Sequence, residues 1–556
     1  MLASSIPSVS RLERSSIVNC QLIIFSQVFL LCAAAMSGQE PVHSQTVVAG
    51  PATTVRISDL ERQADVSPMI YGQMLEDCND HIIYGGIVNE EGKENPSVTA
   101  RLEKMQIPVV RWPAGTAIYD YEWKRGVGPV RTAQSEKIWG GHEYYTFGTD
   151  EYLNWCRKIG TEPYINIPMG NNSAYAHSLG EALDWVEYVN GAPDSPMGAC
   201  RARNGNEAPY GVKFWCLGNE NYLGNPFHRS EKAADYAELL YAYASALKHV
   251  FPGISLLGVG HTGDWNKTVL NRCGEQIDFL TLHFYLTANV NAKVLENPVA
   301  TLFAPEKVEA NIRHFCKELN AYNQSAHRTA RPVRFSIDEW NCRHSVYDGG
   351  AYSFTRRDPR RLYDAAAMAS MLNVFIRTSP YVGMANYIFP VNGHGLLQTV
   401  GEQDVYPSVC YHVYDLYRRL MLGKAVGTDV AGPGYKDVNL SDLKVDGDVD
   451  AALRDVRKDF CFIDCAAMLD KEGRLIVSLV NRSYENRQKV RLSVPSGYEV
   501  AEAWTIGHRD VCAENTAEER DNVTPSPQKV RNKALTLNPC AVTLVVLHPS
   551  NRIFAQ

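Results

Sequence analysis

Residues 213–220 read KFWCLGNE, an apolar run that ends in a glycine, an amide and a carboxylate. Seven other short apolar runs end in glycine or polar residues in the same way. In chain order the eight runs are IYGQMLE (70–76), VVRWP (109–113), PYINIPMG (163–170), KFWCLGNE (213–220), ISLLGVG (254–260), FLTLHFY (279–285), RFSIDEW (334–340) and GMANYIFP (383–390). Runs of this length and composition are typical of buried β-strands.

Segments with helical spacing separate these runs. Between residues 236 and 250 the apolar side chains recur at intervals of three and four, and FPG at 251–253 ends the pattern. Residues 97–107, 150–160, 305–322 and 364–376 also predict helices. Strands that alternate with helices indicate a parallel sheet, and eight repeats fit a closed (β/α)8 TIM barrel in an α/β protein. An open doubly wound sheet is the structural alternative.

The pattern changes beyond Gly423. Residues 473–481, 488–494, 499–506 and 540–548 alternate apolar and polar side chains and are separated by turn residues. We therefore predict a C-terminal all-β sandwich at 423–556 after a catalytic barrel at 66–422. The segment 39–65, with TTVRI at 53–57, is predicted to add a strand to the sandwich.

The N-terminus has the features of an export signal. Arg11 and Arg14 precede the apolar stretch LIIFSQVFLLCAAA at 22–35, and polar residues follow. We predict that residues 1–38 are a secretory signal peptide, which places the mature protein in the periplasm or outside the cell with no stable membrane association. An uncleaved anchor and lipidation at Cys32 remain as alternatives.

Charge and cysteine content restrict the partners. The chain has 55 basic and 62 acidic residues, a net charge of -7, so no positive field is present to bind nucleic acid. The basic run at Arg356, Arg357, Arg360 and Arg361 is expected to be a solvated loop. The 14 cysteines include no CxxC pair, so we predict no zinc site and expect mostly buried, small apolar side chains.

Two carboxylates end predicted strands. Glu220 ends the fourth and Glu339 ends the seventh, 119 residues later. Chemistry in a barrel is located at the carboxyl ends of the strands, so the two side chains are expected to face each other across one mouth. Two such carboxylates are what cleavage of a glycosidic bond needs. Either one alone is better explained as a helix cap or as a partner of an arginine.

Further polar and aromatic residues accompany this pair. Asn219 is placed to donate to a sugar 2-hydroxyl. His283 and Tyr285, at the end of the sixth strand, are placed to orient the carboxylate of Glu339, and Trp340 offers an apolar face to a sugar. Each of these taken singly is more often a satisfied polar or packing group of the core.

Long motifs carry a family resemblance over about residues 66–400. The chain resembles glycoside hydrolase family 51, whose main activity is α-L-arabinofuranosidase. The motifs are YGQMLED with YGGI, VVRWPAG with YDYEWKRGVGP, GTDEYLNWCRKIGTEPYINI, EALDWVEYVNG, WCLGNE and IDEWN.

The resemblance implies a retaining mechanism without a cofactor or a metal. Glu220 matches the general acid/base, Glu339 matches the nucleophile, Glu76 matches a glutamate that holds sugar hydroxyls, and Asn219 matches the asparagine beside the acid/base. The implied enzyme is a non-reducing-end exo-α-L-arabinofuranosidase that acts on arabinose-containing polysaccharides and oligosaccharides.

One motif departs from the family pattern. Many members have Pro-Gly-Gly and then asparagine or another sugar-contacting residue, where this chain has Pro-Ala-Gly and then Thr116. Thr116 is therefore a candidate substrate-binding residue with a shorter polar group. The departure leaves the preferred substrate open, although the chemistry is unaffected.

Three alternatives remain at this stage. A family relative that acts on β-glucan or β-xyloside is the first, and a non-catalytic carbohydrate-binding protein is the second. The third is a dinucleotide-binding loop at GVGHTG (258–263), which matches GxGxxG but follows the fifth strand instead of the first. The sequence leaves open whether copies of the chain form a homo-oligomer.

Overall fold

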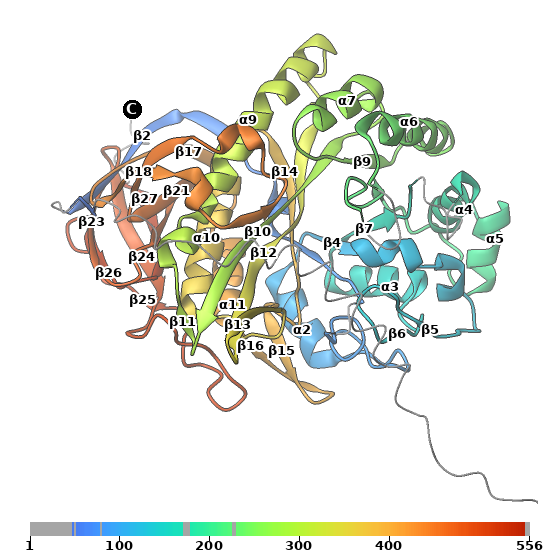
Figure 1. Ribbon diagram of the computed structural model, residues 1–556, viewed down its shortest axis with the longest axis horizontal. Coiled ribbons are helices and arrows are strands. Elements are labelled where there is room, and N and C mark those ends of the chain that lie inside the picture. Colours follow the sequence, from blue (N-terminus) through green and yellow to red (C-terminus); the bar gives the residue numbers. More distant parts are fainter. Residues whose placement is uncertain (1–46, 49–51, 78–79, 171–177, 225–229, 551–556) are drawn as a thin grey trace, which may run out of the picture. The chain divides into compact units, whose positions relative to one another are not determined.

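The structure is a computed structural model that describes residues 47–48, 52–77, 80–170, 178–224 and 230–550 (Figure 1). The predicted signal peptide at 1–38 lies outside the described residues, as does much of the segment 39–65. Within the described ranges, no helix combines the length and the apolar character that crossing a membrane requires.

The predicted (β/α)8 barrel is confirmed. Its parallel strands are β3 (Gly72–Met74), β4 (Val109–Trp112), β7 (Glu162–Ile167), β8 (Phe214–Leu217), β9 (Ser255–Val259), β10 (Phe279–Asn291), β12 (Arg334–Asp348) and β14 (Val382–Tyr387). They are neighbours in the order β10-β9-β8-β7-β4-β3-β14-β12, and the pairing of β12 with β10 closes the ring. Each strand overlaps one of the eight apolar runs, and the closure rules out the open sheet.

Helices follow the strands around the barrel. They are α2 (Pro96–Met105), α3 (Thr149–Ile159), α4 (Leu179–Asn190), α5 (Pro196–Arg203), α6 (Ala233–Val250), α7 (Asp264–Cys273), α8 (Pro298–Leu302), α9 (Ala304–Ser325), α10 (Leu362–Arg377) and α11 (Val409–Leu420). The start of α2 shows how local sequence sets a boundary. The Asn95 side chain accepts the N–H groups of Ser97 and Val98, and Pro96 occupies the first turn.

Helix α10 joins the barrel to the β domain. Every residue from Leu362 to Ile376 is buried, because the helix contacts barrel strand β12 as well as β21 (Ile463–Leu469) and β22 (Leu475–Asn481) of the β domain. A helix that is apolar on all sides is stable only when it is enclosed in this way. At its end, Asn373 and Arg377 both bond to Asp464 of β21, each at 2.8 Å.

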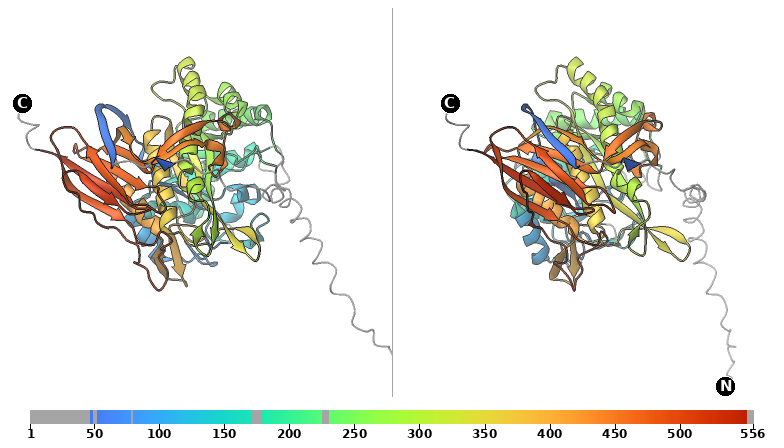
Figure 2. Two further views of the ribbon diagram at one scale, coloured as in Figure 1. Left: turned by 60° about the vertical axis from the view of Figure 1, so that its left-hand side comes forward. Right: turned by 90° about the vertical axis from the view of Figure 1, so that its left-hand side faces the viewer.

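The C-terminal β domain is built on a nine-stranded sheet with a core of its own (Figure 2). The strand order is β25-β24-β27-β22-β21-β17-β2-β23-β26. Strand β2 (Thr53–Asp65) comes from the N-terminal part of the chain and pairs with β17 (Lys424–Ala431) and β23 (Gln488–Ser493). The remaining strands are β24 (Tyr498–Ile506), β25 (Ser526–Pro527), β26 (Ala534–Leu537) and β27 (Val542–Pro549).

Part of the chain beyond residue 423 returns to the barrel. Strands β18 (Gly434–Asn439) and β20 (Arg457–Cys461) form a small sheet with β1 (Val47–Val48). Between them, β19 (Val445–Gly447) pairs antiparallel with barrel strand β10. A Cβ on Gly447 would lie 2.2 Å from the carbonyl oxygen of His283, so only glycine permits this approach. The predicted boundary at 423 therefore does not separate two independent modules.

Strands β10 and β12 extend past the barrel as a ribbon, which the sequence did not predict. Their parallel pairing continues from His283 and Glu339 to Val290 and Val346. Strands β11 (Val294–Leu295) and β13 (Ala351–Thr355) turn back along this ribbon. Two more hairpins lie at the barrel rim, formed by β5 (Gln134–Ser135) with β6 (His142–Glu143) and by β15 (Leu397–Val400) with β16 (Asp404–Pro407).

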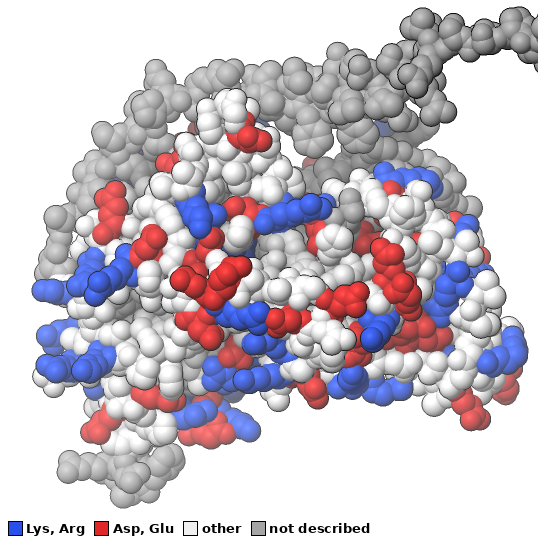
Figure 3. Space-filling model, turned by 90° about the horizontal axis from the view of Figure 1, so that it is seen from below, with Lys and Arg blue, Asp and Glu red and all other residues white. Residues whose placement is uncertain are grey.

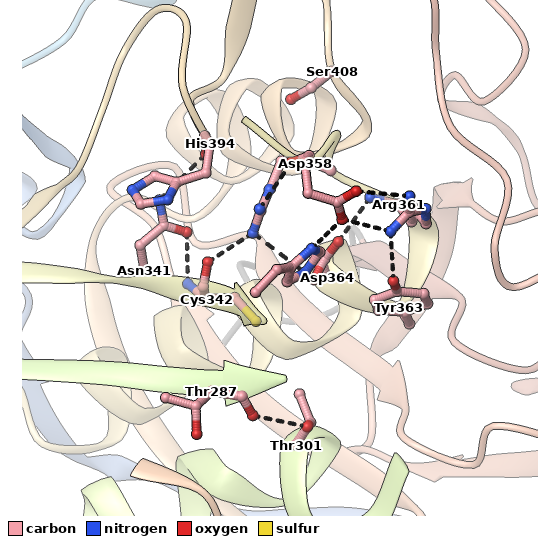
Figure 4. A network of polar contacts seen from close by, with 12 residues as sticks. Thr287, Thr301, Asn341, Cys342, Asp358, Arg361, Tyr363, Asp364, His394 and Ser408 are labelled. Carbon is pink, nitrogen blue, oxygen red and sulfur yellow. Dashed lines mark hydrogen bonds and ion pairs between the residues drawn. The ribbon is translucent and has the colours of Figure 1, made fainter. Parts of the chain in front are cut away.

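The expectation of a solvated basic loop at 356–361 is wrong for its second half. Arg360 and Arg361 are buried, and Arg361 pairs with Asp358 at 2.7 Å (Figure 4). The His344 ring lies between Asp358 and Asp364, with 2.7 Å from Nε2 to the Asp364 carboxylate. The loop is ordered because it packs against the extended part of β12.

Acidic and basic side chains are interspersed on the face of the molecule seen in Figure 3. The described cysteines agree with the sequence analysis. Eleven cysteines are described, all of them free, and eight of these are buried. They therefore serve mainly as small apolar packing groups.

Candidate active site

Glu220, which follows β8, and Glu339, which lies where β12 begins to extend beyond the barrel, meet in the structure. One carboxylate oxygen of each, together with a ring nitrogen of His283, lies within 4.8 Å of the others. Glu220 follows β8 in a left-handed backbone conformation with φ of 45°, which a residue other than glycine adopts at a cost. The separation of the Glu220 and Glu339 carboxylates fits the roughly 5 to 5.5 Å between the carboxyls of retaining glycosidases. It is too short for the water molecule that inverting enzymes place between their two carboxyls.

The Glu339 carboxylate is held ionised. It accepts a hydrogen bond from Arg111 Nη1 at 2.8 Å and another from the hydroxyl of Tyr285. Burial alone would raise the pKa of Glu339, but the charges of His283 and Arg111 and these two hydrogen bonds lower it to about 2. The group is thus a carboxylate at any pH near neutrality.

Arg111 is a buried residue of the site that sequence reasoning missed. It lies in the middle of β4 and is 1% exposed. In addition to Glu339, its Nη2 donates to Asn219 Oδ1 at 2.6 Å and its Nε lies 3.6 Å from Asp338. The arginine inside the apolar run VVRWP is the sequence feature that indicates such a residue, because a buried guanidinium requires acidic partners.

Asn219 presents a free donor. Its Oδ1 is occupied by Arg111, which fixes the orientation of the amide, and its buried Nδ2 has no hydrogen-bond partner among the described residues. The backbone of Asn219 is anchored on both sides by Tyr119, whose hydroxyl donates to the carbonyl at 2.9 Å and accepts the N–H at 3.0 Å. A ligand hydroxyl in the site would satisfy this amide.

Glu76 follows β3 and is bound by the loop after β4. Its Oε1 accepts the N–H groups of Gly115 at 3.0 Å and Ala117 at 3.2 Å. Burial, and then the charge of Glu339, raise the pKa of Glu76 to about 7 despite the N–H of Ala117. Thr116, half-buried between these two N–H donors, begins a short 3-10 helix.

Gly115 allows this loop to approach the carboxylates. A Cβ at this position would lie 2.6 Å from Glu339 Oε1 and 3.5 Å from Glu76 Oε1. The glycine of the motif PAGT is therefore required by the geometry of the site, whatever the identity of the residue after it.

His283 links the two carboxylates, and the β domain supports it. Its Nδ1 lies 2.9 Å from Glu220 and 3.6 Å from Glu339. Burial lowers the pKa of His283, but the charges of Glu339, Glu220 and Asp448 outweigh this and raise it to about 9. Asp448, fully buried beside β19, accepts the backbone N–H of His283 and bonds Nδ1 of His261, both at 2.7 Å.

Asp448 and His261 were not identified from the sequence. His261 belongs to the motif GVGHTG, whose pattern indicates only a dinucleotide loop, and helix α7 follows that motif directly. Asp448 comes from a polar segment of the β domain with no local pattern that connects it to the barrel.

The prediction for Trp340 is wrong. Its side chain is 1% exposed, and its ring packs against Phe375 and Tyr387, each with centroids 5.1 Å away, and against Tyr414. Successive side chains of a strand point to opposite faces, so the neighbour of Glu339 on β12 points away from the sugar side. Trp340 is a core residue.

A second cluster of possible metal ligands lies outside this site. Cys342, His344 and Asp364 are buried with ligand atoms within 4.8 Å of one another. Both ring nitrogens of His344, however, already face Asp358 and Asp364. The cluster is accounted for as a buried ion-pair network that fixes the base of the ribbon.

Comparisons with known proteins identify similar sequences and folds. Residues 101–303 match the family described as the Alpha-L-arabinofuranosidase 1 domain, and residues 338–544 match the Alpha-L-arabinofuranosidase C-terminal domain. The chain is 30% identical to probable alpha-L-arabinofuranosidase C of Aspergillus niger over 87% of this chain and 95% of that protein. It is 31% identical to alpha-L-arabinofuranosidase C of Emericella nidulans over 78% and 86% of the two chains.

A solved structure agrees with these relatives. The GH51 α-L-arabinofuranosidase of Thermotoga petrophila matches with a TM-score of 0.75 and 27% identity, over 89% of this chain and 100% of that chain.

The raised pKa of His283 predicts a pH dependence of stability. The ordinary value is 6.5 and the folded value is about 9, so the stabilisation from the imidazolium is complete below pH 6.5 and is lost as the pH rises through 9. The difference corresponds to roughly 3 kcal/mol of unfolding free energy. We expect urea denaturation to show that the wild type loses about this much more stability than His283→Gln between pH 6.5 and 9.

The comparison of the wild type with His283→Gln isolates the contribution of His283 to the pH dependence of stability. Glu76 releases its proton in the same range, near pH 7, but it does so in both the wild type and the variant. Parallel stability curves for the two proteins would contradict the assignment of a charged His283.

Proposed function

The chain belongs to the α-L-arabinofuranosidases of glycoside hydrolase family 51, and from this membership we propose a retaining mechanism in which Glu339 is the nucleophile and Glu220 is the acid and base. The protein is a glycoside hydrolase that cleaves α-L-arabinofuranosides. The observation that carries the mechanism is the position of one histidine between two carboxylates that lie within 4.8 Å of each other.

In the first step, Glu339 attacks the anomeric carbon while Glu220 gives its proton to the glycosidic oxygen. The bond to the leaving group breaks and an ester bond to Glu339 forms. The ionised state of Glu339, with its pKa near 2, supports its assignment as the nucleophile. Arg111 and Tyr285 hold one carboxylate oxygen each, which fixes the direction of attack.

In the second step, Glu220 takes a proton from a water molecule that attacks the ester. Once Glu339 is esterified its negative charge is gone, and the imidazolium of His283 faces Glu220 as its remaining carboxylate partner within this trio. Glu220 thus serves as the acid in the first step and as the base in the second.

The sugar ring is bound by groups that remain available in the pocket. The free Nδ2 of Asn219 is placed to donate to the 2-hydroxyl, a hydrogen bond that strengthens as the ring becomes oxocarbenium-like. Glu76 is proposed to accept hydrogen bonds from the remaining hydroxyls, and Thr116 to contact the sugar from the same loop.

The substrates are proposed to be terminal non-reducing α-L-arabinofuranosyl groups on polysaccharides and oligosaccharides. The names of the relatives support this choice over β-glucan or β-xyloside. A direct comparison of aryl α-L-arabinofuranoside, aryl β-xyloside and β-glucan tests it. We expect the first to be hydrolysed with retention of configuration, seen by proton NMR of the first-formed sugar. An inverted product, or activity only on the other two substrates, would contradict the proposal.

Variants of the two glutamates test the roles. Glu339→Gln is expected to lower kcat by about 10⁴-fold or more, because no nucleophile remains. Glu220→Ala is expected to lose about 10² to 10⁴-fold on substrates with poor leaving groups and much less on aryl glycosides with good ones. Azide should restore turnover of Glu220→Ala by replacing the activated water.

The matched control is Glu238→Gln, on the exposed surface of α6, which should retain wild-type kinetics. Equal losses of Glu220→Ala on good and poor leaving groups, without rescue by azide, would reject its role as acid and base.

We also propose that the protein is exported to the periplasm or the medium. Support comes from the sequence alone, with Arg11 and Arg14 preceding the apolar stretch at 22–35. The mature protein from the producing cells is expected to begin near residue 39, as determined by N-terminal sequencing. A cytoplasmic protein that retains its first 38 residues would refute export.

A further inference from the structure

The extended part of β12 continues outward from the barrel beyond Glu339. Residues two apart on a strand share a face, so Asn341 and Arg343 lie on the same face as Glu339. Across the ribbon, Tyr285 is paired with Asn341, and Thr287 with Arg343. This face of the ribbon continues to β13, which pairs with the end of β12 (Figure 1).

Arg343 lies on this face of the ribbon, and the ring of Tyr285 separates it from Glu339. The carbon of its guanidinium is 3.1 Å from the ring centroid of Tyr285 and 5.8 Å from that of Phe354. The hydroxyl of the same Tyr285 donates to Glu339. The side chain is half-buried, and the two rings fix its position.

Within the described ranges of the chain, the guanidinium of Arg343 has no acidic partner. Among the residues that the structure describes, no ion pair or hydrogen bond to it is found, while nearby Arg356 pairs with Asp80 and Arg361 with Asp358, both at 2.7 Å. Stacking on a ring leaves the N–H groups of a guanidinium available, and their planar fork matches a carboxylate. Neutral sugar hydroxyls do not require a fixed cation.

Phe354 lies next to Arg343 on the ribbon. Its side chain is 53% exposed and lies across from Ser345, on the same face of the ribbon as Arg343. An exposed ring beside a cation offers an apolar surface for the face of a pyranose and a partner for its charge.

We propose that Arg343, with Tyr285 and Phe354, forms a leaving-group subsite for a uronic acid sugar in the chain that carries the arabinofuranosyl group. The proposal rests on the arabinofuranosidase activity described above and names the class of glycan on which that activity is directed. The carboxylate of the uronate pairs with the guanidinium of Arg343, and its ring lies against Phe354.

The test compares matched substrates. An arabinofuranosylated oligosaccharide that contains a uronate next to the branched sugar is compared with the same oligosaccharide after reduction of its carboxyl to a hydroxymethyl group. The wild type is expected to show a five- to tenfold higher kcat/KM for the acidic form, about the gain of one partly exposed ion pair, and this ratio should fall with added salt.

Variants assign the preference to the subsite. In Arg343→Gln the ratio between acidic and neutral substrates is expected to fall to about one, and Arg343→Lys should retain part of it. Phe354→Ala should raise KM for both oligosaccharides more than for aryl α-L-arabinofuranoside. The matched control is Arg331→Gln, which makes the same change of charge beside Asp278, at the start of β10 and away from the mouth, and should keep the wild-type ratio.

Two results would overturn the subsite. One is equal kcat/KM for both oligosaccharides in the wild type. The other is an equal loss in Arg343→Gln on acidic, neutral and aryl substrates, which would mean that Arg343 only supports Tyr285. Calorimetric binding of the acidic oligosaccharide to Glu220→Gln and to Glu220→Gln/Arg343→Gln reports on the subsite independently of turnover. Failure of the wild type to cleave aryl α-L-arabinofuranoside would count against the proposed function instead.

Discussion

The catalytic site depends on the buried guanidinium of Arg111. It contacts Glu339 and Asp338 on β12 and Asn219 after β8, and so joins three separate parts of the barrel. A cation without access to water is tolerated only where carboxylates and other acceptors surround it, and removal of one partner of such a pair costs about 3 to 5 kcal/mol. The contacts that compensate the buried charge of Arg111 also fix the orientation of the Glu339 carboxylate and of the Asn219 amide.

The charges of the site balance across a short distance. Glu339, Asp338 and Asp448 are countered by Arg111 and His283, so most of the negative charge is compensated before a substrate binds. Glu76 differs from these carboxylates in its protonation. Burial and the nearby charge of Glu339 raise the pKa of Glu76 to about 7. A carboxyl group that gains and loses its proton near neutral pH is well suited to exchange hydrogen bonds with sugar hydroxyls as the ring changes shape.

The barrel could be predicted from the sequence because each strand is a short apolar run with a polar end. The same feature located Glu220, Glu339, His283 and Tyr285, because each lies at or near the end of a predicted apolar run. Trp340 was misjudged because adjacency in a strand puts a side chain on the opposite face. The ribbon beyond Tyr285 and Trp340 could not be predicted, because no apolar run continues into it. Arg360 and Arg361 are buried although the composition of their segment is typical of a solvated loop. The role of Asp448 could not be predicted, because its contacts with His261 and with the backbone of His283 form only in the folded chain.

The strand that carries Gly447 and Asp448 restricts how this architecture can be recombined. The chain leaves the β domain, pairs with β10 and bonds the backbone of His283 before it returns. A barrel expressed alone up to residue 422 would keep both catalytic glutamates but would lack the carboxylate that anchors the histidine between them. Exchange of the β domain among homologues, by evolution or by protein engineers, must therefore preserve this short loop if the hybrid enzyme is to function.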